Sequence, residues 1–158
     1  MTIYIDMDGV LAKWNTSATV ADTHKPGYFL KREEEPGIKN LIQYLTAKGY
    51  EVRILTAAYE DGTAKADKQK WLKEHSIDVP VTFVPYGKNK AAYVDENGVN
   101  FLIDDYSRNL REWEESGNTG IKFYNGVNGN FGTWHGHSIS HLMDAEKLCT
   151  IIENIIAK

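Results

Sequence analysis

The chain has 158 residues, of which 42% are hydrophobic and 25% are charged, and its formal net charge is −4 at pH 7. These values are ordinary for a globular protein that can bury its own core without disulfides or metal staples. The acidic balance gives no sign of the basic surface that nucleic-acid binding requires.

Strand-like and helix-like segments alternate along the chain. The first expected strand covers residues 2–5, and the polar stretch 13–36, which contains two Pro-Gly pairs, is expected to be irregular. Further strands are expected at residues 50–55, 79–84, 99–103 and 120–124, and helices at residues 38–48, 63–75, 88–95 and 108–115. A Gly- and Asn-rich loop over residues 125–136 precedes a last helix, whose apolar stripe is Leu142, Ala145, Leu148, Ile152 and Ile155.

This alternation predicts an α/β fold, a Rossmann-like parallel sheet of five strands flanked by helices. We expect residues 1–158 to form a single domain. Ligands of such sheets bind outside the carboxyl ends of the strands, so the residues that follow each strand are the first candidates for a site.

Two carboxylates follow the first expected strand directly, in the motif Asp6-Met7-Asp8-Gly9. Acids one residue apart at a strand end suit a nucleophile and a proton-transfer group, and they suit a hard cation such as Mg²⁺. Asp-x-Asp-Gly is also a common turn composition, so the motif alone leaves both interpretations open. An EF-hand loop is disfavoured because Val10 stands where an oxygen ligand is needed.

Polar residues of interest also follow the other expected strands. Thr56 ends the second strand, Lys88 and Lys90 follow the third, and Asp104-Asp105 ends the fourth. Each has an ordinary explanation by itself, such as a helix cap or a solvated side chain. Their joint placement at one edge of a single sheet favours a functional site.

This combination resembles the haloacid dehalogenase-like superfamily of phosphohydrolases. The matching pieces are Asp6-Met7-Asp8-Gly9-Val10-Leu11, Ile54-Leu55-Thr56, a lysine at 88 or 90, and Leu102-Ile103-Asp104-Asp105. Within the superfamily, the stretch from Asp6 to Trp14 and the stretch from Leu102 to Tyr106 look like the 5′(3′)-deoxyribonucleotidase group. The resemblance implies a Mg²⁺-dependent phosphomonoesterase that works through an aspartyl-phosphate.

The resemblance also implies roles for individual residues. Asp6 would be the nucleophile and Asp8 the general acid and base, with Thr56 holding a phosphoryl oxygen. Lys90 is preferred as the catalytic lysine because Lys90-Ala91-Ala92 opens a helix, as the family lysine does, and Lys88 stays as the alternative. The implied Mg²⁺ ligands are the Asp6 carboxylate, the Asp8 main-chain carbonyl, Asp104, and Asp105 directly or through water.

The implied substrate-binding residues are Trp14, Thr56, Ala57 and Lys88. Trp14 stands at a position that the nucleotidase group uses near the base, and Tyr28 and Phe29 are further stacking candidates. Residues 13–36 would be a cap-like insertion, much smaller than the helical cap of that group. Nucleotide specificity and completion of the cap by a partner subunit therefore stay open.

Three alternatives follow from the same residues. The open cleft left by a small cap would admit a different phosphoester, such as a sugar phosphate or a nucleic-acid end. A catalytically silent binding module on this fold is disfavoured because both Asp6 and Asp8 are present. A response-regulator-like receiver needs its phosphorylated aspartate after the third strand, where Val84-Pro85 stands.

The expected partner is a small-molecule phosphate ester, by resemblance a nucleoside monophosphate. No membrane partner is expected, nucleic acid is disfavoured by the charge, and a homo-oligomer stays open. The single Cys149 is predicted to be a buried thiol in a reducing cytoplasm. His135, His137 and His141 have side chains that can bind a transition metal, but an exposed polar segment or a substrate-facing loop is favoured.

Overall fold

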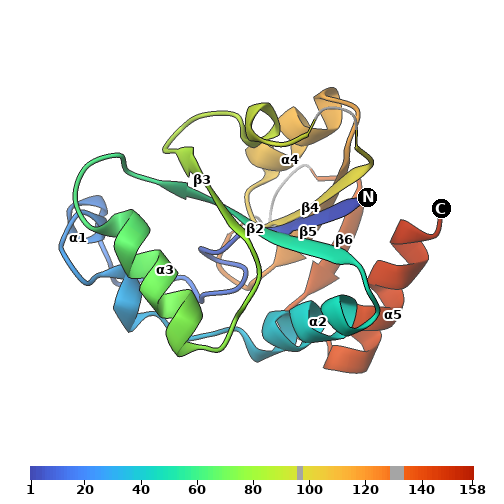
Figure 1. Ribbon diagram of the computed structural model, residues 1–158, viewed down its shortest axis with the longest axis horizontal. Helices are drawn as coiled ribbons and strands as arrows, with labels where there is room; N and C mark the ends of the chain where they lie inside the picture. The colour runs from blue at the N-terminus through green and yellow to red at the C-terminus, as the bar shows by residue number, and fades with distance from the viewer. Residues whose placement is uncertain (96–97, 129–133) are drawn as a thin grey trace.

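The computed structural model describes residues 1–95, 98–128 and 134–158. Its centre is a parallel sheet of six strands in the order β3-β2-β1-β4-β5-β6 (Figure 1). The strands are β1 (Thr2–Ile5), β2 (Glu51–Ala58), β3 (Val81–Pro85), β4 (Asn100–Asp104), β5 (Thr119–Tyr124) and β6 (His137–Ser140). The predicted Rossmann-like α/β fold is confirmed, with one strand more than the five expected.

Helices cover both faces of the sheet. They are α1 (Val20–Thr23), α2 (Pro36–Ala47), α3 (Ala64–Glu74), α4 (Ser107–Glu115) and α5 (Ala145–Ile156), with 3₁₀ turns η1 (Phe29–Lys31) and η2 (Lys90–Tyr93). Helices α2 and α5 pack side by side, whereas α4 lies on the opposite side of the sheet (Figure 1). None of the described helices has the length and apolarity that a membrane crossing needs.

Side chains of β1 alternate between two cores. Ile3 and Ile5, both fully buried, belong to the larger core, which α2, α3 and α5 complete. Tyr4 points the other way and meets Trp113 of α4 edge to face, with ring centroids 5.6 Å apart. This alternation is the pattern of a strand that is covered on both sides.

The chain reverses its direction across the sheet at β1. Strands β2 and β3 follow on one side of β1, while β4, β5 and β6 follow on the other. The carboxyl ends of β1 and β4 are neighbours because Ile5 pairs with Ile103. Such a switch point is where open α/β sheets bind ligands.

The strand that the sequence analysis missed is β6, which pairs with β5 from the Ile121–His137 pair onward. Its only apolar residue is Ile139, which is fully buried, so the segment carries no strand-like apolar pattern. The last helix begins only at Ala145, and Leu142 is 83% exposed, so Leu142 was wrongly assigned to its apolar stripe. Residues 129–133 of the predicted 125–136 loop lie outside the described residues.

Three further expectations can be compared with the structure. Strand β2 continues past Thr56 to Ala58, because residues 56–58 pair with β3, so Thr56 lies inside the strand instead of ending it. The 13–36 segment is not wholly irregular, since it contains α1 and η1. The thiol of Cys149 is buried, as predicted.

The segment 13–36 forms a closed excursion between β1 and α2. Its ends are joined by main-chain hydrogen bonds from Lys13 N to Glu33 O, 2.8 Å, and from Glu35 N to Leu11 O, 2.7 Å. The excursion lies beside α3 (Figure 1), where the Asp67 carboxylate accepts a hydrogen bond from Gly27 N at 2.8 Å. We call residues 13–36 the insertion below.

Candidate active site

The turn after β1 places the first motif rigidly at the sheet edge. Asp6 N donates to Ile103 O of β4 at 2.9 Å, and Met7 N donates to the Asp6 carboxylate at 2.7 Å. Gly9 has φ +81°, and a Cβ atom there would lie 2.3 Å from Asp105 Oδ2. Only glycine therefore allows this turn and the Asp105 side chain to lie so close.

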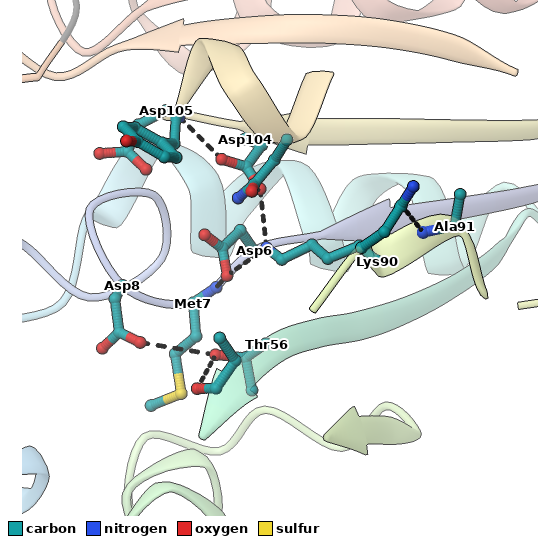
Figure 2. Close-up of polar contacts among 12 residues, drawn as sticks. Asp6, Met7, Asp8, Thr56, Lys90, Ala91, Asp104 and Asp105 are labelled. Atoms are coloured by element: carbon teal, nitrogen blue, oxygen red, sulfur yellow. Dashed lines mark hydrogen bonds and ion pairs between the residues drawn. The ribbon is translucent and has the colours of Figure 1, made fainter. Parts of the chain in front are cut away.

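Three carboxylates converge at the carboxyl ends of β1 and β4. Asp6, Asp104 and Asp105 are all buried, and each offers an oxygen within 4.8 Å of the others (Figure 2). We call these three residues the acidic cluster. Buried oxygen ligands at this spacing are what a hard divalent cation requires.

The buried Lys90 pairs with two carboxylates of the acidic cluster. Lys90 Nζ lies 2.9 Å from Asp6 Oδ1 and 2.7 Å from Asp104 Oδ2. Burial raises the pKa of Asp6 to about 8, with Asp104 and Asp8 adding to the rise and Lys90 opposing it. Burial also disfavours the charge on Lys90, but Asp104 and Asp6 outweigh it and hold the pKa of Lys90 above its ordinary value.

Asp105 is held by two asparagine side chains. Asn125 Nδ2 and Asn128 Nδ2 donate to Asp105 Oδ2 at 2.9 and 2.7 Å, and Asn125 also donates to Gly9 O at 2.8 Å. Burial, followed by the charge of Asp104, raises the pKa of Asp105 to about 7, although the Asn128 hydrogen bond opposes this. The sequence analysis missed both asparagines, although they follow the carboxyl end of β5 as the other site residues follow their strands.

Asp8 lies on the side of Asp6 away from Asp104 and faces Thr56 of β2 (Figure 2). Its Oδ2 atom accepts an ion-pair hydrogen bond from Lys68 Nζ, and the Thr56 hydroxyl lies 3.5 Å from the same oxygen. Its other oxygen, Oδ1, is buried and has no hydrogen-bond partner among the described residues. The sequence analysis also missed Lys68. The sequence did offer a sign of its burial, because this lysine falls on the same side of helix α3 as the buried Ala64, Trp71 and Leu72.

Other residues expected at the site are less closely associated with the acidic cluster. Lys88 is exposed in the loop after β3, and the ion pairs to the acidic cluster come, within the described part of the chain, from Lys90. Ala57 contributes its carbonyl oxygen to Lys68 Nζ at 2.6 Å. Trp14 is 41% exposed and lies in the insertion, where the guanidinium of Arg32 is 5.4 Å from its ring centroid.

The three histidines do not gather into a metal site. His135 and His137 are exposed, while a ring nitrogen of His141 lies 2.8 Å from Tyr124 O. Among the described residues, the one group of three metal-ligating side chains that meets at a point is the acidic cluster.

A family model described as "5′ nucleotidase, deoxy (Pyrimidine), cytosolic type C protein" matches residues 19–140. The chain belongs to this family. It is thus a phosphomonoesterase of the haloacid dehalogenase-like superfamily. The segment that matches contains Thr56, Lys68, Lys90 and the Asp104-Asp105 pair, and it begins after Asp6 and Asp8.

Solved structures of phosphatases share the architecture of this nucleotidase family member. One is a D,D-heptose 1,7-bisphosphate phosphatase from B. bronchiseptica, complexed with magnesium and phosphate, at 13% identity and TM-score 0.67, covering 99% of this chain and 98% of the other. Another, from Burkholderia thailandensis, has 14% identity and TM-score 0.64, with 99% of each chain covered. At such identities the likeness shows the fold alone. Comparison with curated proteins gave no match.

Proposed function

We propose that the protein is a Mg²⁺-dependent hydrolase of deoxynucleoside monophosphates that passes the phosphoryl group through Asp6. The observation that carries this proposal is the position of Asp6, at a strand end beside two further buried carboxylates and the Lys90 ammonium. Family membership supports the hydrolytic reaction, and the nucleotidase description of the family supports the substrate class.

The acidic cluster fits Mg²⁺ by its chemistry. Its three oxygens are hard ligands, and their burial raises the pKa values of Asp6 and Asp105, as expected where negative charge lacks a sufficient counter-charge. Asp6, Asp104 and Asp105 would hold the ion, and the family resemblance adds the main-chain carbonyl of Asp8. When bound, Mg²⁺ would offset the repulsion between the Asp6 carboxylate and an anionic phosphate.

Asp6 and Asp8 would divide the hydrolysis into two displacements. An Asp6 oxygen attacks phosphorus while the ester oxygen leaves with a proton from Asp8. Asp8 then takes a proton from a water molecule, whose oxygen attacks phosphorus and releases Asp6 and inorganic phosphate. The position of Asp8 beside Asp6 and its partly exposed side chain support this role.

Thr56 and Lys90 would bind the phosphoryl oxygens. The Thr56 hydroxyl oxygen accepts a hydrogen bond from Lys68 Nζ at 3.0 Å, and its own proton has only a long contact, 3.5 Å to Asp8 Oδ2, which it would exchange for a phosphoryl oxygen. Lys90 directs two of its three N–H groups at carboxylates of the acidic cluster, and the third is left for substrate. The Ala57 main chain and the exposed Lys88 remain proposed substrate contacts.

The insertion is proposed as a reduced cap over this site. Its joined ends and its contacts with α3 support a fixed position, and Trp14 presents an exposed aromatic face that suits stacking on a base. We infer a cytoplasmic location because the family is described as cytosolic.

The test is phosphate release from a panel of monophosphates with Mg²⁺ and with chelator. The panel should hold 5′- and 3′-deoxynucleotides, ribonucleotides, sugar phosphates and phosphorylated oligonucleotide ends. We expect Mg²⁺-dependent release that is fastest from deoxynucleotides. Release confined to another ester would contradict the nucleotide substrate, and release that is unaffected by chelator would contradict the metal.

A further inference from the structure

Helix α3 carries a buried lysine that the reaction described above does not use. The side chain of Lys68 is 1% exposed, although lysines are rarely buried unless they are paired. The helix presents it from the same side as Trp71 and Leu72, which enter the larger core. A buried charge is costly unless neighbouring groups pair with it and accept its hydrogen bonds.

The acceptors around the Lys68 ammonium account for all of its protons. Nζ donates to Asp8 Oδ2, to Thr56 Oγ1 at 3.0 Å and to Ala57 O at 2.6 Å. An ammonium group has three N–H donors and no acceptor. No proton of Lys68 is therefore left for a phosphate group.

We propose that Lys68 is a positioning residue that aims the Asp8 carboxylate and the Thr56 hydroxyl at the substrate without itself binding phosphate. By holding Asp8 Oδ2, it fixes the direction of the Asp8 carboxylate beside Asp6. By donating to Thr56 Oγ1, it forces that hydroxyl to act as a donor. This inference rests on the proposed function, because it assigns Lys68 to the same reaction.

Contacts behind Lys68 fix its direction. The ammonium lies 4.5 Å from the ring centroid of Phe29 in the insertion. The neighbouring Asp67 accepts from Gly27 N, and Trp71 Nε1 donates to Arg32 O at 2.8 Å, so α3 is anchored to the insertion on both sides of Lys68. A lysine held in this way can orient other groups because it cannot itself reorient.

Lys90 provides the contrast that makes the inference testable. Lys90 has two acceptors among the described residues and one proton left, so its loss should weaken phosphate binding. Loss of Lys68 should instead lower kcat and leave KM and the affinity for inorganic phosphate unchanged. Misplacing reacting groups by about 1 Å costs about 10²-fold in rate, and we expect a loss of that order for Lys68→Met.

The experiment compares Lys68→Met, Lys68→Arg and the control Lys70→Met in steady-state kinetics and in calorimetric titration with inorganic phosphate and Mg²⁺. Lys70 lies on the exposed side of α3, so its replacement should change nothing. Folded Lys68→Arg should also lose kcat, because the planar guanidinium cannot satisfy three convergent acceptors. Wild-type kcat in either Lys68 variant, or lost phosphate affinity in Lys68→Met, overturns the proposal.

A second measurement separates this inference from the proposed function. Wild-type protein that hydrolyses nothing in the panel contradicts the proposed function. The unfolding midpoints of Lys68→Met, Asp8→Asn and the double variant test the Lys68–Asp8 pair without any turnover. Non-additive shifts support the orienting contact, and additive shifts overturn it, because residues that interact directly are coupled.

Discussion

At the scale of single residues, each carboxylate of the acidic cluster is oriented by hydrogen bonds from neighbouring residues. Asp104 Oδ1 accepts from Tyr106 N at 2.7 Å, and its Oδ2 accepts from Asn109 Nδ2 at 2.9 Å. Asp6 receives the Met7 main-chain N–H, and Asp105 receives the two asparagines. The cluster is thus preorganised before any ligand arrives, which is how charged sites act efficiently.

Replacing Asp6 with asparagine should abolish turnover while the protein stays folded, because the shape is kept and the nucleophile is lost. Phosphate release measures the turnover of Asp6→Asn, and thermal unfolding shows whether the variant is folded. A variant with the wild-type rate would show that Asp6 is not the nucleophile.

Asp8→Asn should slow the reaction by about 10²–10⁴-fold, the usual effect of losing one general acid or base. The loss should be smaller with an activated ester whose leaving group needs no proton, since only the second displacement then requires Asp8. Comparing the rates on the two kinds of ester tests this, and an equal loss on both would count against the acid role.

Gly9→Ala should damage the site and the stability together. A left-handed φ costs an alanine about 1–2 kcal/mol, and the new Cβ also meets the Asp105 carboxylate. Gly49→Ala is the matched control, because Gly49 has φ +86° with nothing within 4 Å of the added Cβ. Urea unfolding and phosphate release should show lost activity for Gly9→Ala alone, and full activity of a folded Gly9→Ala would refute the packing argument.

The sequence was informative about the residues that directly follow strands. The sequence alone predicted that Asp6, Asp8 and Asp104 lie close together, because the carboxyl ends of parallel strands share one edge of the sheet. It did not predict that Lys68 lies beside Asp8, since that distance depends on how α3 packs. An amphipathic pattern does not give a helix's position over the sheet. The choice between Lys88 and Lys90 likewise needed the backbone, which buries Lys90 and leaves Lys88 exposed.

At the scale of elements, β6 shows where periodicity fails. Its residues His137, Ser138 and Ser140 are polar, and only Ile139 enters the core. The strand forms because β5 offers an unpaired parallel edge, which is a tertiary cause that no local pattern records. The apolar strands β1 and β4 were predicted because burial on both faces gives them nearly continuous apolar runs.

Ile139→Ala should destabilise the protein by about 2–5 kcal/mol, the usual cost of truncating a buried isoleucine. Ser138→Ala is its control, because Ser138 is exposed on the same strand and its change should stay within about 0.5 kcal/mol. Both free energies of unfolding can be measured in urea. Equal small effects would show that β6 is not packed as described.

At the scale of the whole molecule, the topology explains why so many charges lie in one buried place. The chain reverses its course across the sheet at β1, so strands distant in sequence deliver Asp6 and the Asp104-Asp105 pair to a common point. Helix α3 brings Lys68 to Asp8 beside that point, Phe29 of the insertion lies against Lys68, and the loop after β5 supplies Asn125 and Asn128.

Mg²⁺ should raise the melting temperature of the folded protein, since an ion that binds only the folded state stabilises it by mass action. At a hundred times its Kd, the ion contributes about 2.7 kcal/mol. Thermal unfolding with Mg²⁺ and with chelator measures the shift, and Asp104→Asn should remove most of it. An equal shift in that variant would place the ion elsewhere.

The most direct test of the account is to trap the phosphoryl group on the enzyme. Wild-type protein would be mixed with a deoxynucleoside monophosphate and Mg²⁺, quenched in acid within one turnover, and its peptides examined by mass spectrometry. The account predicts a phosphate adduct on the peptide that contains Asp6, localised to that side chain and missing from Asp6→Asn. An active enzyme that carries its phosphate on another residue would contradict it.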